Sequence, residues 1–391
     1  MTGLFTNTIA EATSGSGITF SNDIVPATPL SNRNMIINGA MNVYQRGSLS
    51  ITQSNNGGFA LDRFGYEQNT NMGQWEGTMS QHTMSSADYN TTGFANALKL
   101  LTGTHETAVG ADEYARIHTK LESQDIKHLQ YGTASAKTTT LSFWVNSSVA
   151  GTYGITMYSQ CSQARTINKT YTINTADTWE KKTLTIVGDT GQAHNDDNAL
   201  GMMIVWSLAS GSNYDGVNST SWANYSTTNL NGGHAQDGVI TTSSATFYLT
   251  GVQWELGSVA TPFEHRSYGD ELLRCSRYYH KHHSGADASG GAGNNDLYQN
   301  YLNIIWYSSV NARGLYHHPV PMRVNPSFSA SGNFQTITGT SLSDSDFSSG
   351  DYGGTPVYSV RVNKSGNTTY YGTTVRSNND ATAYFAWDAE L

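Results

Sequence analysis

Short stretches of alternating apolar and polar residues recur along this chain, and they constrain its fold more than any other feature. Within 138–145, Leu141, Phe143 and Val145 would share one face of an extended strand. The segment 200–206 is more continuously apolar, as a central strand of a sandwich can be. Glycine and asparagine turns separate such segments. The pattern predicts an all-β fold built as a sandwich or jelly roll.

The composition indicates a folded chain with more than one domain. The protein has 391 residues, a length that suits two or three domains. Charged residues make up only 13%, whereas 23 tyrosines and 8 tryptophans help to raise the aromatic content to 11%. Because disordered chains carry many charges and few aromatic residues, we expect a folded protein rich in β-structure.

The charge balance and the hydropathy pattern exclude two classes of partner. The net charge is −9 and the chain has no lysine- or arginine-rich run, which argues against nucleic acid or an anionic membrane surface. No stretch approaches about 18 consecutive apolar residues, and residues 1–7 lack the features of a signal peptide. We therefore expect a protein that is made in a cytoplasm and does not insert into a membrane. If it acts outside a cell, it leaves by lysis or as part of a particle.

No motif in the chain is typical of an enzyme, and we expect no catalytic residues and no cofactor. A Gly-x-Ser-x-Gly elbow, a phosphate-binding loop and zinc-ligand spacings are all missing. Fibres that cleave glycans use paired acids, for which the candidates would be Asp196–Asp197, Asp112–Glu113, or Asp62 with Glu67. Adjacent acids point to opposite sides of a strand, so these residues are better explained as solvated loop positions.

The cysteines and histidines do not predict a metal site. Cys161 and Cys275 are too few for a disulfide framework, and we expect both to be small buried residues. In an extended chain His280 and His282 would share a face, with His283 on the other. Two ligands are too few for a closed zinc site unless symmetry adds further copies. We favour a polar helix end, where imidazolium suits the helix dipole.

Composition and turn signals divide the chain into four parts. Residues 1–34 are small, polar and proline-containing, and we expect an extended N-terminal arm that attaches to a partner; the alternative is a flexible terminus. Residues 35–265 are expected to form the jelly-roll domain and residues 266–283 a linker helix. Residues 284–391 should begin with a flexible loop and continue as a smaller C-terminal β-sandwich.

The linker carries the signals of a helix. Ser267 can cap its N-terminus, and Asp270 suits the first turn. Leu272, Cys275 and Tyr279 recur at a spacing that places them on one face. We expect a helix of about three turns that packs on the jelly roll or on symmetry mates.

Residues 252–279 resemble a segment shared by a large family of bacteriophage virion proteins, the tail-fibre and surface proteins. Residues 320–326 and 388–391 resemble the same family in the same order, and residues 11–19 resemble a segment near the joints of trimeric phage fibres. The resemblance implies a virion protein on the tail or capsid surface. Residues 1–34 would then bind other virion proteins.

Residues 35–265 resemble the jelly roll of carbohydrate-binding modules, which implies glycan binding. The similarity lies in residues 38–41, 141–145 and 247–254 and in Trp179. Relatives that hold a structural calcium ion usually place carboxylates at positions that here carry Ala40, Asn42, Thr250 and Gly251. Calcium normally requires carboxylate ligands, so the sequence does not support that site.

The polar loop 207–236 holds the candidate glycan-binding residues, which combine aromatic rings with hydrogen-bonding groups. They are Tyr214, Asp215, Trp222, Asn224 and Tyr225. Aromatic residues exposed on a loop usually mark a partner site. In the alternative interpretation, these residues pack a long loop onto the sandwich.

These features together predict a phage virion structural protein, a short tail fibre or spike that binds host-surface glycans. We expect a homotrimer, because a weakly charged surface rich in threonine, asparagine and tyrosine could form polar interfaces. Many weak sites would then act together. The alternatives are a capsid decoration or head-fibre protein that stabilises the shell, and a glycan depolymerase.

Overall fold

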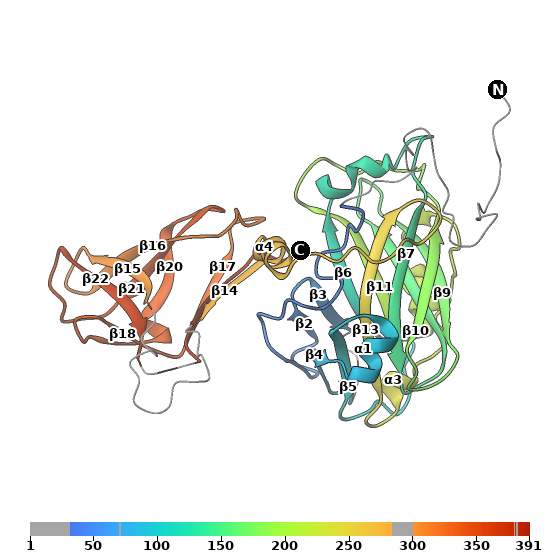
Figure 1. The fold of residues 1–391 in the computed structure, drawn as a ribbon, viewed down its shortest axis with the longest axis horizontal. Coiled ribbons are helices and arrows are strands. Elements are labelled where there is room, and N and C mark those ends of the chain that lie inside the picture. The colour runs from blue at the N-terminus through green and yellow to red at the C-terminus, as the bar shows by residue number, and fades with distance from the viewer. Residues whose placement is uncertain (1–31, 70–71, 284–299, 379, 381) are drawn as a thin grey trace, which may run out of the picture.

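The computed structural model describes residues 32–69, 72–283, 300–378, 380 and 382–391. Strands dominate it, and they form a large and a small β-sandwich on either side of helix α4 (Tyr268–Ser276) (Figure 1). The predicted all-β architecture of a jelly roll, a short helix and a second sandwich is confirmed. Of the predicted arm 1–34, only residues 32–34 are among the described residues, and the predicted loop 284–296 lies outside them.

The large sandwich consists of two antiparallel sheets, A and B. In sheet order, sheet A contains β1 (Leu49–Ile51), β4 (Gly77–Thr83), β5 (Asn96–Thr102), β13 (Thr246–Leu256), β7 (Thr139–Ser147) and β10 (Glu180–Ile186). Sheet B contains β12 (Ala223–Asn224), β9 (Arg165–Ile173), β8 (Gly151–Ser159), β11 (Leu200–Ser210), β6 (Tyr114–Glu122), β3 (Phe64–Gln68) and β2 (Gly57–Leu61).

The core of the large sandwich lies between these sheets, where the alternating side chains meet. Leu141, Phe143 and Val145 on β7 have no exposed surface, which confirms the predicted inward face of that strand. Across the core, the ring of Phe143 meets that of Trp206 on β11 edge-to-face, with 5.8 Å between the ring centroids. Burial of such large rings stabilises this unit.

The small sandwich also has two antiparallel sheets. Sheet C contains β14 (Tyr279–His283), β23 (Tyr384–Asp388) and β17 (Ser327–Ser331). Sheet D contains β19 (Ser341–Ser343), β18 (Asn333–Thr336), β22 (Tyr371–Ser377), β15 (Asn300–Trp306), β16 (Asn311–His317), β21 (Val357–Asn363) and β20 (Phe347–Gly353). Tyr358, Val360 and Val362 on β21 face its core.

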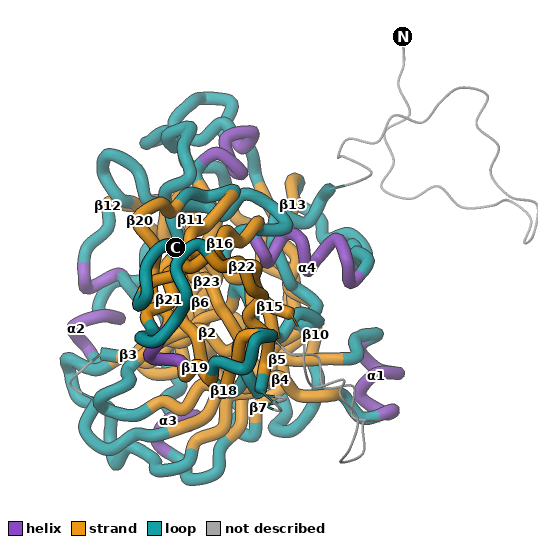
Figure 2. Tube along the Cα trace, turned by 90° about the vertical axis from the view of Figure 1, so that its left-hand side faces the viewer, coloured by secondary structure: helices purple, strands orange, loops and turns teal. Residues whose placement is uncertain are grey.

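The helices are short and lie at the margins of the strands (Figure 2). Besides α4 they are α1 (Ser86–Thr92), α2 (Ser212–Asp215), α3 (Gly238–Thr241), and the 3-10 helices η1 (Gln124–Leu129), η2 (Thr227–Asn229) and η4 (Asp344–Asp346). Within the described part of the chain, no helix has the length and apolar content needed to span a membrane.

Helix α4 begins where the sequence predicts but ends earlier. Ser267 caps it by accepting a hydrogen bond from the backbone N–H of Asp270. The predicted three-turn helix ends at Ser276, and Tyr279 belongs to β14 instead. The linker prediction for 266–283 is therefore corrected in its last part, because pairing with β23 extends these residues as a strand of sheet C.

The Asn38–Gly39 turn joins α4 to the jelly roll. The buried Asn38 side chain donates to the carbonyl of Val43 and accepts from its N–H. The backbone N–H of Asn38 donates to Glu271 on α4 at 2.5 Å. The N–H of Val252 donates to the carbonyl of Gly39 at 2.9 Å. A Cβ at Gly39 would lie 2.1 Å from the carbonyl oxygen of Val252, so only glycine permits this approach.

Residues 388–391 return to the junction between the two sandwiches, beside α4 (Figure 1). Arg46 pairs with Asp388 at 2.6 Å, and the buried Arg63 pairs with Glu390. The guanidinium of Arg63 also lies 3.4 Å from the ring centroid of Tyr278. These contacts fasten residues 388–391, and with them the end of β23, to the jelly roll.

Candidate functional site

The candidate residues of the loop between β11 and α3 separate into two groups. Trp222 lies at one end of the jelly roll, where its indole N–H donates to the carbonyl of Val187 at 2.7 Å. Its ring meets that of Tyr131 edge-to-face at 5.7 Å between centroids, and it packs against the core. Trp222 is therefore half-buried and covers one end of the sandwich.

Arg165 holds the segment that follows Trp222. The guanidinium donates to Asn224 Oδ1 at 2.9 Å, to the carbonyl of Trp222 at 3.0 Å, and to the buried Asp189 carboxylate at 2.7 Å. This charge-assisted network fixes β12 beside β9. Asn224 itself is exposed.

Tyr225 points to the opposite side of β12 from Asn224, as side chains alternate along an extended chain. Its ring meets that of Tyr158 edge-to-face, with centroids 5.2 Å apart. The Tyr158 hydroxyl donates to Gln160 at 2.6 Å. Burial raises the pKa of this hydroxyl, so it stays protonated at neutral pH.

Tyr214 and Asp215 lie in α2, away from the other three candidates. The Tyr214 hydroxyl accepts a hydrogen bond from Asn69 at 2.8 Å, and its ring packs edge-to-face on Tyr114 at 5.0 Å. Burial raises the pKa of Asp215, and the nearby carboxylate of Asp237 raises it further. The five candidates do not converge on one site.

The loop itself is bonded to the outer surface of sheet B. Asn168 on β9 accepts a hydrogen bond from the N–H of Ser219 at 2.9 Å and donates to the carbonyl of Asn229 at 3.1 Å. Ser207 on β11 donates to Asn231 at 3.1 Å. Because these groups are buried or half-buried, the bonds fix the loop on the sheet.

A pocket of about 450 Å³ opens next to the Trp222 group. Its lining residues are Lys127, Gln130, Tyr131, Thr133, Ser135, Ala193 and His194. Tyr131 and His194 are buried and lie ring to ring at 5.7 Å, whereas Gln130, Thr133 and Ser135 are exposed at the rim. We refer to it as the Tyr131 pocket.

Two buried atoms of the Tyr131 pocket residues are left without hydrogen bonds of ordinary geometry to any described residue. They are the hydroxyl of Tyr131 and Nδ1 of His194. Most buried polar atoms in native proteins have a partner. Thr139 is a polar neighbour of the Tyr131 hydroxyl and the backbone of Gln160 one of the His194 imidazole, so a ligand that offers hydroxyl groups would have to displace these contacts. Burial lowers the pKa of His194, which leaves the imidazole neutral and able both to donate and to accept.

Sequence reasoning missed the Tyr131 pocket although it found Trp222 beside it. Tyr131 follows η1 and His194 lies in the loop before β11, so neither belongs to the aromatic loop 207–236. No local pattern marks them, because strand pairing alone brings these loops to the same end of the sandwich.

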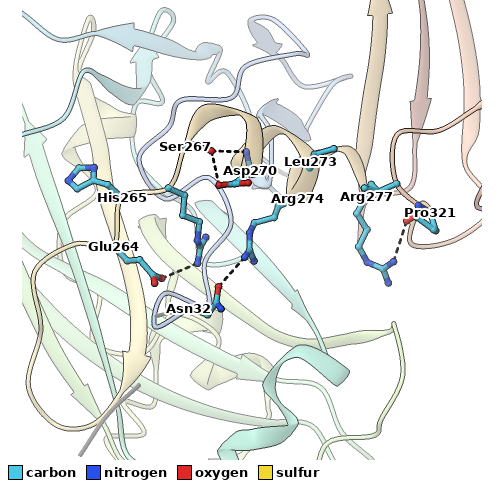
Figure 3. Close-up of a pocket in the computed structure, with 11 residues that line it drawn as sticks. Asn32, Glu264, His265, Ser267, Asp270, Leu273, Arg274, Arg277 and Pro321 are labelled. Carbon is cyan, nitrogen blue, oxygen red and sulfur yellow. Dashed lines mark hydrogen bonds and ion pairs between the residues drawn. The ribbon is translucent and has the colours of Figure 1, made fainter. Parts of the chain in front are cut away.

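A larger pocket of about 640 Å³ lies beside α4 and is lined by charged side chains (Figure 3). Arg266 pairs with Glu264 at 3.4 Å, and Arg274 donates to Asn32 at 3.2 Å. Arg277 bonds both Glu122 and the carbonyl of Pro321. These charges already have partners within the protein, and Arg277 bonds residues of both sandwiches.

The acids weighed as catalysts are engaged in structural bonds. The buried Asp62 accepts from Gln45 at 2.7 Å, and Glu67 pairs with Arg116 at 3.1 Å. Asp112 accepts from Asn213 at 2.5 Å and Asp197 from the N–H of Ala199 at 3.2 Å. These side chains serve turns and strand edges. That the protein is not an enzyme stays a prediction.

The histidines of β14 pack among aromatic rings. His280 Nε2 and His282 Nδ1 lie 2.7 and 3.4 Å from the Tyr316 hydroxyl, so both side chains lie on the same side of the strand. His280 also stacks on Trp387. Among the described residues, no three histidine, cysteine, aspartate or glutamate side chains are placed to hold a metal ion. Cys161 and Cys275 are both free and buried.

Comparison with known proteins gives structural similarity only. No protein-family model matches the sequence, and no curated protein matches it. Among solved structures, the enzymatically active domain of tailspike protein 4 of bacteriophage CBA120 is similar over 57% of this chain, at 12% identity and a TM-score of 0.30. This chain covers 21% of that tailspike chain.

Carbohydrate-binding modules are also similar. The family 11 module from Clostridium thermocellum, in complex with a β-1,3-1,4-mixed-linked tetrasaccharide, matches 55% of this chain and 98% of its own at 10% identity and a TM-score of 0.26. The CBM22-1 xylan-binding domain from Paenibacillus barcinonensis Xyn10C matches 58% and 96% at 10% identity and a TM-score of 0.27. At these scores the function must rest on the residues of the site itself.

Proposed function

We propose that this protein is a phage virion structural protein that binds host-surface glycans, and that its glycan site is the Tyr131 pocket. The carrying observation is the combination, in about 450 Å³, of two buried rings with exposed amide and hydroxyl groups at the rim. Sugars present apolar C–H faces and many hydroxyls, and rings with hydrogen-bonding side chains recognise both.

The neighbouring residues make the pocket rigid. The N–H of Gly132 donates to the carbonyl of Asp189 at 2.7 Å, and Lys127 donates to the carbonyl of His194 at 2.6 Å. A site that is ordered before binding loses less entropy when a ligand enters. Trp222 supports the floor through its contact with Tyr131, while Asn224 and Arg165 extend the polar surface beyond the rim.

In this proposal the molecule acts as a short homotrimeric fibre or spike. Residues 1–34 attach it to other virion proteins, and the jelly roll and C-terminal sandwich face the host. A single shallow pocket binds weakly, and several copies on one particle raise the effective affinity. Glycan binding depends on the Tyr131 pocket. The trimer and the attachment through residues 1–34 do not depend on it.

A glycan array with conservative variants tests the site. Tyr131→Phe removes the hydroxyl but keeps the ring, and Ser135→Ala removes one exposed hydroxyl of the rim. We expect the wild type to bind at least one glycan and both variants to bind it more weakly, while Tyr225→Phe, on the other side of β12, binds as the wild type does. Equal binding by all four proteins would refute the site.

The second candidate is a capsid decoration or head-fibre protein that binds no glycan. It is favoured by the internal bond from Trp222 to Val187 and by the bonds that fix the loop on sheet B. It predicts that no glycan binds and that removing the protein lowers the stability of the capsid. A depolymerase would instead release reducing sugar from host polysaccharide.

A further inference from the structure

A third pocket, of about 590 Å³, lies between the two sandwiches on another flank of α4. Its walls come from three parts of the chain: Tyr44 before β1, Tyr268 and Leu272 on α4, and Lys281 with Tyr384 from sheet C. None of these residues belongs to the Tyr131 pocket or to the loop 207–236. We call it the Lys281 pocket.

The Lys281 pocket contains a cation that has no counter-ion. Among the described residues, no carboxylate lies within ion-pair distance of Lys281 Nζ, and Nζ makes no hydrogen bond there. Nζ lies over the ring of Tyr384, at 4.0 Å from its centroid. The side chain is half-buried, so solvent screens this charge less than that of a free surface lysine.

The carboxylates on and near these elements already have partners: on α4, Glu271 pairs with Arg266 at 3.5 Å and Asp270 accepts from Ser267 at 2.7 Å. Asp62 accepts from Gln45 at 2.7 Å, Asp388 pairs with Arg46 at 2.6 Å, and Asp380 accepts from Thr382 at 2.7 Å. None of them lines the pocket. The uncompensated charge of Lys281 therefore favours an anionic group from outside the described chain.

The other walls suit a ring-shaped ligand rather than a bare ion. Tyr268 is 58% exposed although it is a large aromatic residue, and Leu272 adds an apolar surface one turn further along α4. Tyr44 bears a hydroxyl that lies 3.0 Å from that of Ser48. Aromatic faces pack against the C–H groups of sugars, and the tyrosine hydroxyls can bond their hydroxyl groups.

The wall between the sandwiches is fixed before any ligand enters. Gln45 donates to Asp62 and, at 3.0 Å, to the carbonyl of Tyr279, and it accepts from the N–H of Lys281 at 3.3 Å. The bonds to Tyr279 and Lys281 tie the jelly roll to β14 next to the cation, and the bond to Asp62 fixes the Gln45 side chain. The position of Lys281 relative to Tyr44 is thus set by the fold.

We propose that the Lys281 pocket binds an acidic saccharide, with the sugar carboxylate on Lys281 and the ring against Tyr268 and Tyr384. The proposal does not rest on the Tyr131 pocket, because the two sites share no residue. The junction between the sandwiches would then bind a ligand as well as join the two units.

Titration calorimetry on the full chain tests the proposal with three probes: an oligogalacturonate, the same oligosaccharide after reduction of its carboxylates to alcohols, and free galacturonate. We expect the acidic oligosaccharide to bind, the reduced one to bind at least about tenfold more weakly, and added salt to weaken binding, as the loss of one charged hydrogen bond predicts. Binding of free galacturonate with the same dependence on Lys281 would place a single sugar in the pocket.

Variants distinguish a loss of binding at the Lys281 pocket from binding at another site and from a folding defect. Lys281→Met should weaken binding of the acidic oligosaccharide about tenfold or more, Lys281→Arg should restore most of it, and the exposed change Tyr268→Ala should weaken it without lowering Tm. Lys181→Met, at an exposed lysine of β10 that lines none of these pockets, is the matched control and should bind normally. The proposal is overturned if Lys281→Met and Tyr268→Ala bind like the wild type, if no acidic sugar binds, or if only a polyglutamate peptide binds through Lys281.

Discussion

Arg277, directly after α4, donates two hydrogen bonds of 2.6 and 2.7 Å to the carboxylate of Glu122 at the end of β6. The Glu122 side chain has no exposed surface, and it also accepts from the Tyr278 hydroxyl at 2.6 Å. Burial would raise the pKa of Glu122, but the bonds from Arg277 and Tyr278 outweigh it and lower the pKa. One buried anion therefore clamps the linker to the jelly roll.

Breaking this clamp from the arginine side should destabilise the protein. Arg277→Met leaves the Glu122 charge buried without its main partner, so we expect the free energy of unfolding to fall by about 3 kcal/mol. Arg274→Met on the exposed side of α4 is the control and should change it by less than about 0.5 kcal/mol. Chemical denaturation measures both; equal effects of the two changes would contradict the role of the clamp.

Breaking the ion pair between Arg63 and Glu390 should also lower the stability of the protein. The two side chains are 2% and 6% exposed, so Glu390→Gln should lower the free energy of unfolding by roughly 3 kcal/mol. Asp388 is 40% exposed in its pair with Arg46, and Asp388→Asn should cost under about 1 kcal/mol. A larger loss for Asp388→Asn in thermal denaturation would show that burial does not govern these pairs.

The Asn38–Gly39 turn makes a steric prediction. A Cβ at Gly39 would lie 2.1 Å from the carbonyl oxygen of Val252, so Gly39→Ala should lower stability by about 3 kcal/mol or prevent folding. Gly269 on α4 has nothing within 4 Å of an added Cβ, and Gly269→Ala should raise stability by about 0.5–1 kcal/mol. Thermal denaturation of the two variants should therefore move Tm in opposite directions.

The C-terminal sandwich should lose stability in acid. Burial lowers the pKa values of His280 and His318 to about 4, from an ordinary value of 6.5. Between these values the unfolded chain binds more protons than the folded one, so stability is complete above about pH 6.5 and falls as the pH falls toward 4. Fluorescence of Trp387, which both rings contact, should show a falling Tm over this range.

Two comparisons check the source of that pH dependence. His280→Gln with His318→Gln should flatten the acid-side fall in Tm of the C-terminal sandwich. Burial raises the pKa of Asp62 in the jelly roll to about 6 from 3.8, so that residue has the opposite sign and adds stability as the pH falls through about 6. A fall in Tm that persists in the double variant would contradict the assignment to these histidines.

Much of the fold follows from local alternation. The alternation within 138–145 placed Leu141, Phe143 and Val145 on one face of a strand, and all three are buried. The pattern failed at Tyr279, which continues a helical spacing but forms a strand. Its partner, Asp388, is more than a hundred residues away, and no local signal reports that pairing.

The candidate site was predictable only in part. Trp222 was identified by its aromatic loop, but its contact with Tyr131 depends on which loops meet at the end of the sandwich. Tyr214 has the same local signal and packs elsewhere, on Tyr114. Composition therefore indicates a binding surface, whereas the arrangement of strands determines which residues share it.

The central claim is that the Tyr131 pocket binds glycan, and the most direct measurement is the Kd of the full chain for the strongest glycan found on an array. We expect Tyr131→Phe to raise this Kd about tenfold without lowering Tm, as loss of one buried hydrogen bond predicts. The same Kd for Tyr131→Phe and the wild type, or no glycan bound by either, would contradict the account.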